Sequence, residues 1–109
     1  MNINLKFTNL EPTESLKAYA ETKFKSIEKV LKTLDPTGAA ILYIELAHAT
    51  KHHQKGNIYY AEAKLDIPGK NFYVNEQEND LYAAIDVAKD TMSRAVERFK
   101  DQKLDHDRE

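Results

Sequence analysis

The chain contains no cysteine and only three glycines, and these absences exclude several kinds of site. Without cysteine, neither a disulfide nor a thiolate-ligated metal can hold the fold together, which suits a reducing compartment. Gly38, Gly56 and Gly69 lie far apart, so no glycine-rich loop can cradle a phosphate group. No serine stands in the context of a nucleophile elbow, and the carboxylates are scattered. We therefore expect no enzyme activity and no small-molecule substrate.

Long hydrophobic runs and an excess of one charge sign are also missing. The N-terminal segment alternates polar and apolar residues, which is neither a signal peptide nor a membrane span. We therefore expect a cytoplasmic protein with no membrane partner. The 16 basic and 18 acidic residues give a formal net charge of −2. A strongly basic balance would indicate nucleic acid directly, so any such interaction here must depend on the local arrangement of charge.

The hydrophobic pattern predicts one α+β domain with the element order β-α-β-β-β-α. Thr13 is a candidate N-cap for the first helix, and Asn79 or a neighbour for the second. A polar hairpin connection is predicted at 51–57 and a turn at 68–71. The predicted elements are strands at 2–8, 40–49, 58–67 and from 72 onward, and helices at 14–34 and from about 79 to 103.

Both predicted helices are amphipathic, and each needs an apolar surface to cover. The economical arrangement packs both on one face of a four-stranded, mostly antiparallel sheet and leaves the other face open. The domain is expected to span 1–103, followed by a short charged tail at 104–109.

Three histidines lie in or near the predicted hairpin connection: His48, His52 and His53. Imidazole groups can ligate zinc or nickel, but this spacing matches no established site, and we expect no metal. RNA contact by His52 or His53 and a purely solvated hairpin tip remain open alternatives.

The tyrosines divide between the two faces of the predicted sheet and its helices. Tyr19, Tyr43 and Tyr59 are assigned to the core or its edge. Tyr60 and Tyr73 are expected on the outer face, where their rings could stack on bases. The general preference of tyrosine for strands explains the same positions without a ligand.

The second helix carries an ordered charge pattern. At helical spacing, one solvent stripe is acidic, arginines flank it on one side and lysines on the other. Ion pairs such as Asp90–Arg94 would make this a solvated face, whereas contacts from the flanks to phosphates would make it a binding surface. Charge alone favours the solvated face. The residues are Asp86, Asp90, Glu97 and Asp101 in the stripe, with Arg94 and Arg98, and Lys89 and Lys100, beside it.

Two segments carry a resemblance to a known family. Asp80-Leu81-Tyr82-Ala83-Ala84-Ile85-Asp86 opens the second helix, and basic residues follow it at Arg94, Arg98, Lys100 and Lys103. This resembles the signature of the ribosome hibernation-promoting factor family, also called ribosome-associated inhibitor A or sigma-54 modulation protein. The first strand and the helix containing Lys23-Phe24 and Ile27-Glu28-Lys29 are similar to the N-terminal part of that family.

The resemblance implies a fold similar to double-stranded RNA-binding domains and a role in silencing idle ribosomes under stress. Such proteins bind the 30S subunit and its 16S rRNA near the decoding centre, between head and body, and obstruct mRNA and tRNA sites. No cofactor is implied, and we expect a monomer away from the ribosome. Since the chain ends soon after the second helix, it resembles the short type of the family.

The resemblance also implies which residues contact rRNA phosphates. On the first helix these are Lys17, Lys23 and Lys29, and on the second they are Arg94, Arg98, Lys100 and Lys103. Thr91 departs from the family, which usually places a lysine there. The alternative hypothesis is a protein-interaction module without direct rRNA binding, which agrees with the near-neutral charge and the sigma-54 label.

Overall fold

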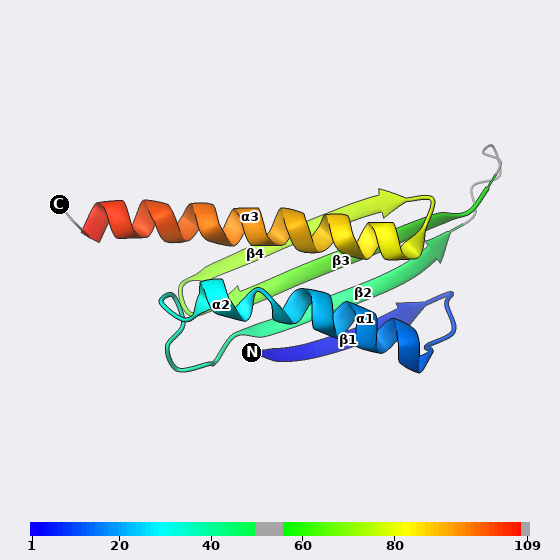
Figure 1. Ribbon diagram of the computed structural model, residues 1–109, viewed down its shortest axis with the longest axis horizontal. Helices are drawn as coiled ribbons and strands as arrows, with labels where there is room; N and C mark the ends of the chain where they lie inside the picture. Colours follow the sequence, from blue (N-terminus) through cyan, green and yellow to red (C-terminus); the bar gives the residue numbers. More distant parts are fainter. Residues whose placement is uncertain (50–55, 108–109) are drawn as a thin grey trace.

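The computed structural model of the chain describes residues 1–49 and 56–107, with side chains up to Leu104 (Figure 1). The α+β class is confirmed, and so is the predicted element order, except that the first helix is divided in two. The histidines at 52 and 53 lie outside the described residues. The elements are β1 (Asn2–Thr8), α1 (Glu14–Lys25), α2 (Glu28–Leu31), β2 (Ile41–Ala49), β3 (Ile58–Ile67), β4 (Lys70–Glu78) and α3 (Leu81–Asp107).

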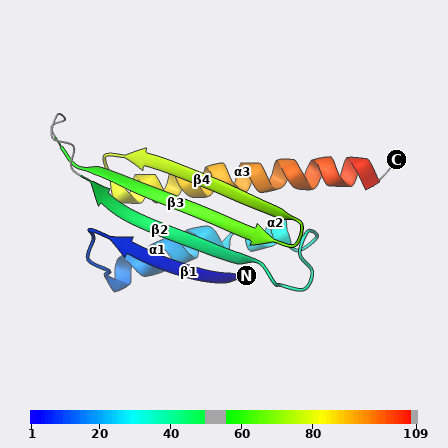
Figure 2. The same ribbon diagram turned by 180° about the vertical axis from the view of Figure 1, so that it is seen from behind.

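The four strands form one mixed sheet in the order β1-β2-β3-β4. β1 and β2 are parallel because a helical crossover joins them, whereas β2–β3 and β3–β4 are antiparallel hairpin pairs. The helices all lie on one face of the sheet, and the opposite face is uncovered (Figures 1 and 2). None of the helices in the described part of the chain is long and apolar enough to cross a membrane.

Strand alternation directs one row of side chains into the core and the next to the outer face. On β2, Leu42, Ile44 and Leu46 are buried beneath the helices, whereas Tyr43 between them is 45% exposed. The assignment of Tyr43 to the core or its edge was wrong, because the alternation of its own strand places it outward. Tyr73 is 60% exposed, as predicted.

The first predicted helix is divided into α1 and α2, contrary to the single helix expected over 14–34. At the break, the Ser26 hydroxyl donates to the Lys23 carbonyl over 2.7 Å, and the Ile27 N–H donates to the Phe24 carbonyl over 3.0 Å. This three-residue hydrogen bond tightens the turn and ends the regular helix. The core residues on both sides of the break are buried: Phe24, Ile27 and Leu31. The break therefore cannot be predicted from the spacing of the apolar residues.

The boundaries of β4 and α3 also differ from the predictions. β4 begins at Lys70, two residues early, because Pro68 and Gly69 alone make the turn and Gly69 takes a positive φ of 85°. Asp80 caps α3, with its carboxylate accepting from the Ala83 N–H at 3.3 Å. α3 continues to Asp107, beyond the predicted end near Lys103.

Asp35 is a buried carboxylate that holds the connection between α2 and β2. It accepts hydrogen bonds from the Thr37 hydroxyl at 3.0 Å and the Ala40 N–H at 2.7 Å. Burial alone would raise the pKa of Asp35, but these hydrogen bonds outweigh it and lower the pKa below the ordinary value of 3.8. The ionised form therefore stabilises the fold.

We expect Asp35→Asn to unfold at a lower urea concentration than the wild type near neutral pH. Since the folded-state pKa is lowered, the advantage of the wild type should persist from about pH 7 to about pH 5 and be lost below about pH 4. Urea unfolding midpoints across this range measure it. A difference that grows on acidification would contradict this account of Asp35.

Candidate nucleic-acid interface

All seven predicted phosphate-binding residues lie in the helical layer. α1 carries Lys17 and Lys23, α2 carries Lys29, and α3 carries Arg94, Arg98, Lys100 and Lys103. Every one of these side chains is exposed or partly exposed. The helices share one face of the sheet (Figure 1), so all seven cations come from elements of the same layer.

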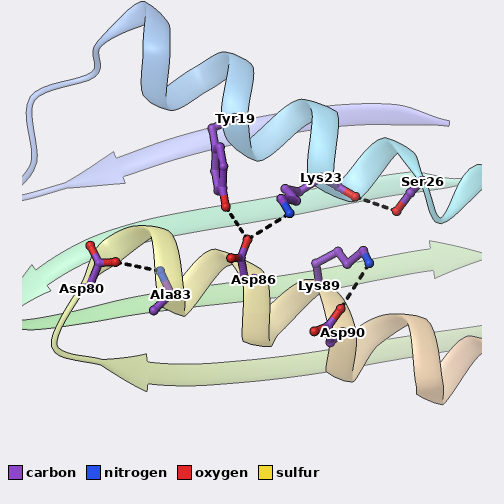
Figure 3. Close-up of polar contacts among 8 residues, drawn as sticks. All are labelled: Tyr19, Lys23, Ser26, Asp80, Ala83, Asp86, Lys89 and Asp90. Carbon is purple, nitrogen blue, oxygen red and sulfur yellow. Dashed lines mark hydrogen bonds and ion pairs between the residues drawn. The ribbon is translucent and has the colours of Figure 1, made fainter.

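A polar bridge joins α1 to α3 at the centre of this layer (Figure 3). The Tyr19 hydroxyl donates to Asp86 Oδ1 over 2.6 Å, and Lys23 Nζ lies 3.6 Å from the same oxygen. The Tyr19 ring meets the Tyr82 ring edge-on at 4.7 Å between centroids. Asp86 therefore faces α1 and contacts Lys23, while its side chain stays 43% exposed.

The bridge perturbs the titration of Tyr19. The hydrogen bond to Asp86, together with desolvation, raises the pKa of Tyr19 from 10.0 to about 12. Because the folded-state pKa is raised, the neutral phenol stabilises the fold below about pH 10, and this contribution is lost as pH rises toward about 12.

We expect one tyrosine of the folded protein to ionise near pH 12, and this step to disappear in Tyr19→Phe. Asp86→Asn should bring the Tyr19 pKa back toward 10.0 because it removes the charged acceptor. Ultraviolet absorbance titration of the three proteins measures both effects. A Tyr19 step near pH 10 in the wild type would show that the bridge is not formed.

The arginines of α3 are not used in the predicted helix-surface ion pair. Asp90 lies beside Lys89, with 3.1 Å between Lys89 Nζ and Asp90 Oδ1, rather than pairing with Arg94. Among the described residues, neither Arg94 nor Arg98 has a carboxylate within ion-pair distance. These guanidinium groups are therefore available to an external anion. This agrees with the binding surface, the alternative that the charge pattern alone did not favour.

The basic residues of α3 divide between its two flanks. Arg98 lines a recess along β4 together with Lys70. Lys100 and Lys103 line another recess beside Thr33 and Leu34, after the end of α2. Lys70 was missed in the sequence because it was placed in a turn. Its position directly after Pro68-Gly69, at the start of an edge strand, could have indicated it as a candidate residue.

Two residues singled out in the sequence have structural contacts. The Thr91 hydroxyl donates to Glu76 Oε1 over 3.0 Å, which ties α3 to β4. His48 Nε2 lies 2.9 Å from Asn57 Oδ1, and the His48 ring lies 5.0 Å from the Tyr59 ring. In residues 1–49 and 56–104, no group of three potential ligands could hold a metal ion. The roles considered for His52 and His53 fall outside the described residues.

Comparison with known sequences finds a family match over almost the whole chain. Residues 3–104 match the family described as sigma 54 modulation protein / S30EA ribosomal protein. The ribosome hibernation promoting factor of Salmonella typhimurium is 26% identical over 106 residues, which cover 97% of this chain and 100% of that protein. Its counterpart from Escherichia coli K12 is 24% identical with the same coverage.

Solved structures show the same fold. The N-terminal domain of Protein Y from Thermus thermophilus superposes with a TM-score of 0.74 at 33% identity, covering 91% of this chain and 99% of that one. A ribosomal subunit interface protein from Coxiella burnetii gives a TM-score of 0.71 at 16% identity, covering 92% of this chain and 98% of that one. The second likeness concerns the fold alone.

Proposed function

Because this chain belongs to the sigma 54 modulation protein / S30EA ribosomal protein family, we propose that it is a ribosome hibernation factor acting on the small subunit. Relatives named as hibernation promoting factors align with it from end to end. Binding would take place in the cytoplasm, in the stress and stationary states in which idle ribosomes accumulate. The resemblance seen in the sequence is thereby confirmed at the level of the family.

The proposed binding surface is the helical layer, and the proposed partner is 16S rRNA near the decoding centre. The observation that carries this is the pair Arg94 and Arg98, exposed on α3 without carboxylate partners among the described residues. A planar guanidinium group matches phosphate oxygens in a two-pronged geometry, and its charge releases counterions from the RNA. Lys17, Lys23, Lys29, Lys100 and Lys103 would extend the contact.

Translation would be inhibited because the bound domain occupies the space that mRNA and tRNA need. Bound between head and body of the 30S subunit, a folded domain excludes mRNA and the A- and P-site tRNAs from the same space. This mechanism needs no chemical step and no cofactor. The bridge from Tyr19 and Lys23 to Asp86 would hold α1 against α3 in the bound domain.

Co-sedimentation with purified 30S and 70S particles tests the proposal. We expect the protein in the ribosomal fractions at low salt. If the seven cations each neutralise one phosphate, the slope of log affinity against log salt should be about −5 to −6. Absence from the ribosomal fractions at low salt would contradict the proposal.

A protein-interaction module is the second candidate, favoured by the uncovered outer face of the sheet. Tyr43 and Tyr73 are 45% and 60% exposed on that face, and exposed aromatic rings are common anchors of protein interfaces. A stable protein partner that survives nuclease treatment and is lost on Tyr43→Ala would support this candidate. Retention of the protein on nuclease-sensitive ribosomal particles alone would count against it.

A further inference from the structure

A recess of about 280 Å³ lies between β4 and the C-terminal half of α3. Among the strands that the structure describes, β4 is an edge strand that pairs only with β3, so its outer edge offers backbone groups without a partner in that sheet. The side chains that matter for the argument are Lys70, Phe72 and Tyr73 from β4, and Arg98, Phe99 and Gln102 from α3. Arg98 is the only one of these that the family resemblance assigns to rRNA.

Lys70 is held at this recess by two aromatic rings. Lys70 Nζ lies 5.7 Å from the ring centroid of Phe72 and 5.5 Å from that of Phe99. The two rings meet edge-on, with centroids 5.7 Å apart. Cation–π contacts orient the ammonium group but leave its charge uncompensated. Lys70 is therefore a positioned cation, unlike a lysine that moves freely in solvent.

The charge of this recess is unbalanced, in contrast to others on the molecule. No carboxylate of residues 1–49 or 56–104 lines it, so the field of Lys70 and Arg98 is directed at any anion that enters. The recess beside Lys100 and Lys103 is also positive but has no aromatic wall. Two further recesses contain equal numbers of lysines and carboxylates. One is lined by Lys23, Lys89, Asp86 and Asp90, and the other by Lys6, Lys64, Glu45 and Glu62.

We propose that this recess binds one phosphate group of a single-stranded RNA segment, shared between Lys70 and Arg98. The inference rests on the proposed function, since the ribosome supplies the RNA. The guanidinium group of Arg98 can grip two phosphate oxygens, while Lys70 supplies a point charge. Gln102 can both donate to and accept from a base edge or ribose.

Tyr73 indicates that the RNA is single-stranded. Its side chain leaves β4 on the face opposite Phe72, and it is 60% exposed. Because β4 is the edge of the sheet, a strand passing from the recess over that edge meets the Tyr73 ring. An aromatic ring on the outside can stack only on a base that is not already paired and stacked in a helix.

Salt dependence of 30S binding tests the shared phosphate. Lys70→Met keeps the aliphatic packing on Phe72 and Phe99 but removes the charge, and Arg98→Gln is the second variant. The double variant is expected to reduce the salt slope by roughly 0.7–0.9, the value of one phosphate contact, and each single variant by less, because the remaining cation still neutralises part of the charge of the shared phosphate. Lys6→Met is the matched control, an exposed edge-strand lysine on β1 at the opposite side of the sheet. Unfolding midpoints establish that each variant is folded.

The outcomes separate this inference from the proposed function. If the wild type fails to co-sediment, the proposed function itself is contradicted. If the wild type binds but the double variant has the same slope as Lys6→Met, the phosphate site alone is overturned. A double variant whose slope falls by roughly 1.4–1.8, the value of two separate phosphate contacts, overturns the sharing. We further expect an ultraviolet crosslink from Tyr73 to rRNA in the bound complex, and a crosslink mapped there to a ribosomal protein would overturn the assignment to RNA.

Discussion

Arg94→Glu combined with Arg98→Glu is expected to weaken binding to the small subunit at least ~100-fold. Each guanidinium–phosphate contact is charge-assisted and contributes about 1.5–3 kcal/mol, and about 1.4 kcal/mol corresponds to a factor of ten. The substitution also places two carboxylates against phosphates. Both residues are exposed on α3, so the fold should be unaffected. Co-sedimentation at constant salt, with unfolding midpoints measured in parallel, gives both quantities.

The matched control is Lys6→Glu combined with Lys64→Glu, which changes the net charge by the same amount. Both lysines are exposed on the outer face of the sheet, away from the helical layer. We expect this control to bind within a few-fold of the wild type, since exposed charges separated by more than about 10 Å are screened at ordinary salt. Equal losses in the two double variants would mean that only net charge matters, and that no helical binding surface exists.

Phe24→Ala is expected to lower the free energy of unfolding by about 3–5 kcal/mol, the usual cost of deleting a fully buried phenyl ring. Phe24 is fully buried in the core, at the end of α1 where the chain turns into α2. A loss of this size is a large share of the roughly 5–15 kcal/mol that stabilises a domain. Urea unfolding at 25 °C measures it.

Tyr43→Ala provides the comparison, because Tyr43 is an aromatic residue on the uncovered sheet face. Its removal should change the unfolding free energy by only about 0.5 kcal/mol. Phe24→Ala should still bind 30S particles under conditions where it remains folded, since the ring contacts no solvent. A loss below about 1 kcal/mol would show that the core closes around the missing ring.

Strand alternation and turn chemistry made most of the fold predictable. Ile3, Leu5 and Phe7 face the core side of β1, and the turn at Pro68-Gly69 joins β3 to β4 as expected. The four-stranded sheet with helices on one face follows from two amphipathic helices that need covering. The further likeness to double-stranded RNA-binding domains stays a prediction.

Features that depend on contacts between distant residues were not predictable. The break at Ser26 arises from one side-chain hydrogen bond to the Lys23 carbonyl, while the apolar spacing continues across it. The helical wheel places Asp86 outside the core stripe, but only the packing of α1 against α3 shows that Tyr19 and Lys23 meet it.

The error at Tyr43 is of another kind, because the alternation of its own strand was enough to place that side chain on the outer face.

The sequence predicted which residues belong to the candidate site better than it predicted how they are arranged in space. Family resemblance selected the cations of the helices, and the structure places them in one layer but on separate flanks of α3. The charge pattern favoured a helix surface with ion pairs such as Asp90–Arg94. In the structure Asp90 lies against Lys89 instead, so Arg94 does not pair with Asp90. Lys70 was missed because its role depends on Phe99, which lies 29 residues away in the sequence but over the same recess.

A cryo-EM reconstruction of vacant ribosomes mixed with this protein tests the central claim most directly. The account predicts density for the domain between the head and body of the 30S subunit, with the helical layer and Arg94 and Arg98 against 16S rRNA. Density elsewhere on the ribosome, or a domain bound there through the outer face of the sheet, would contradict it.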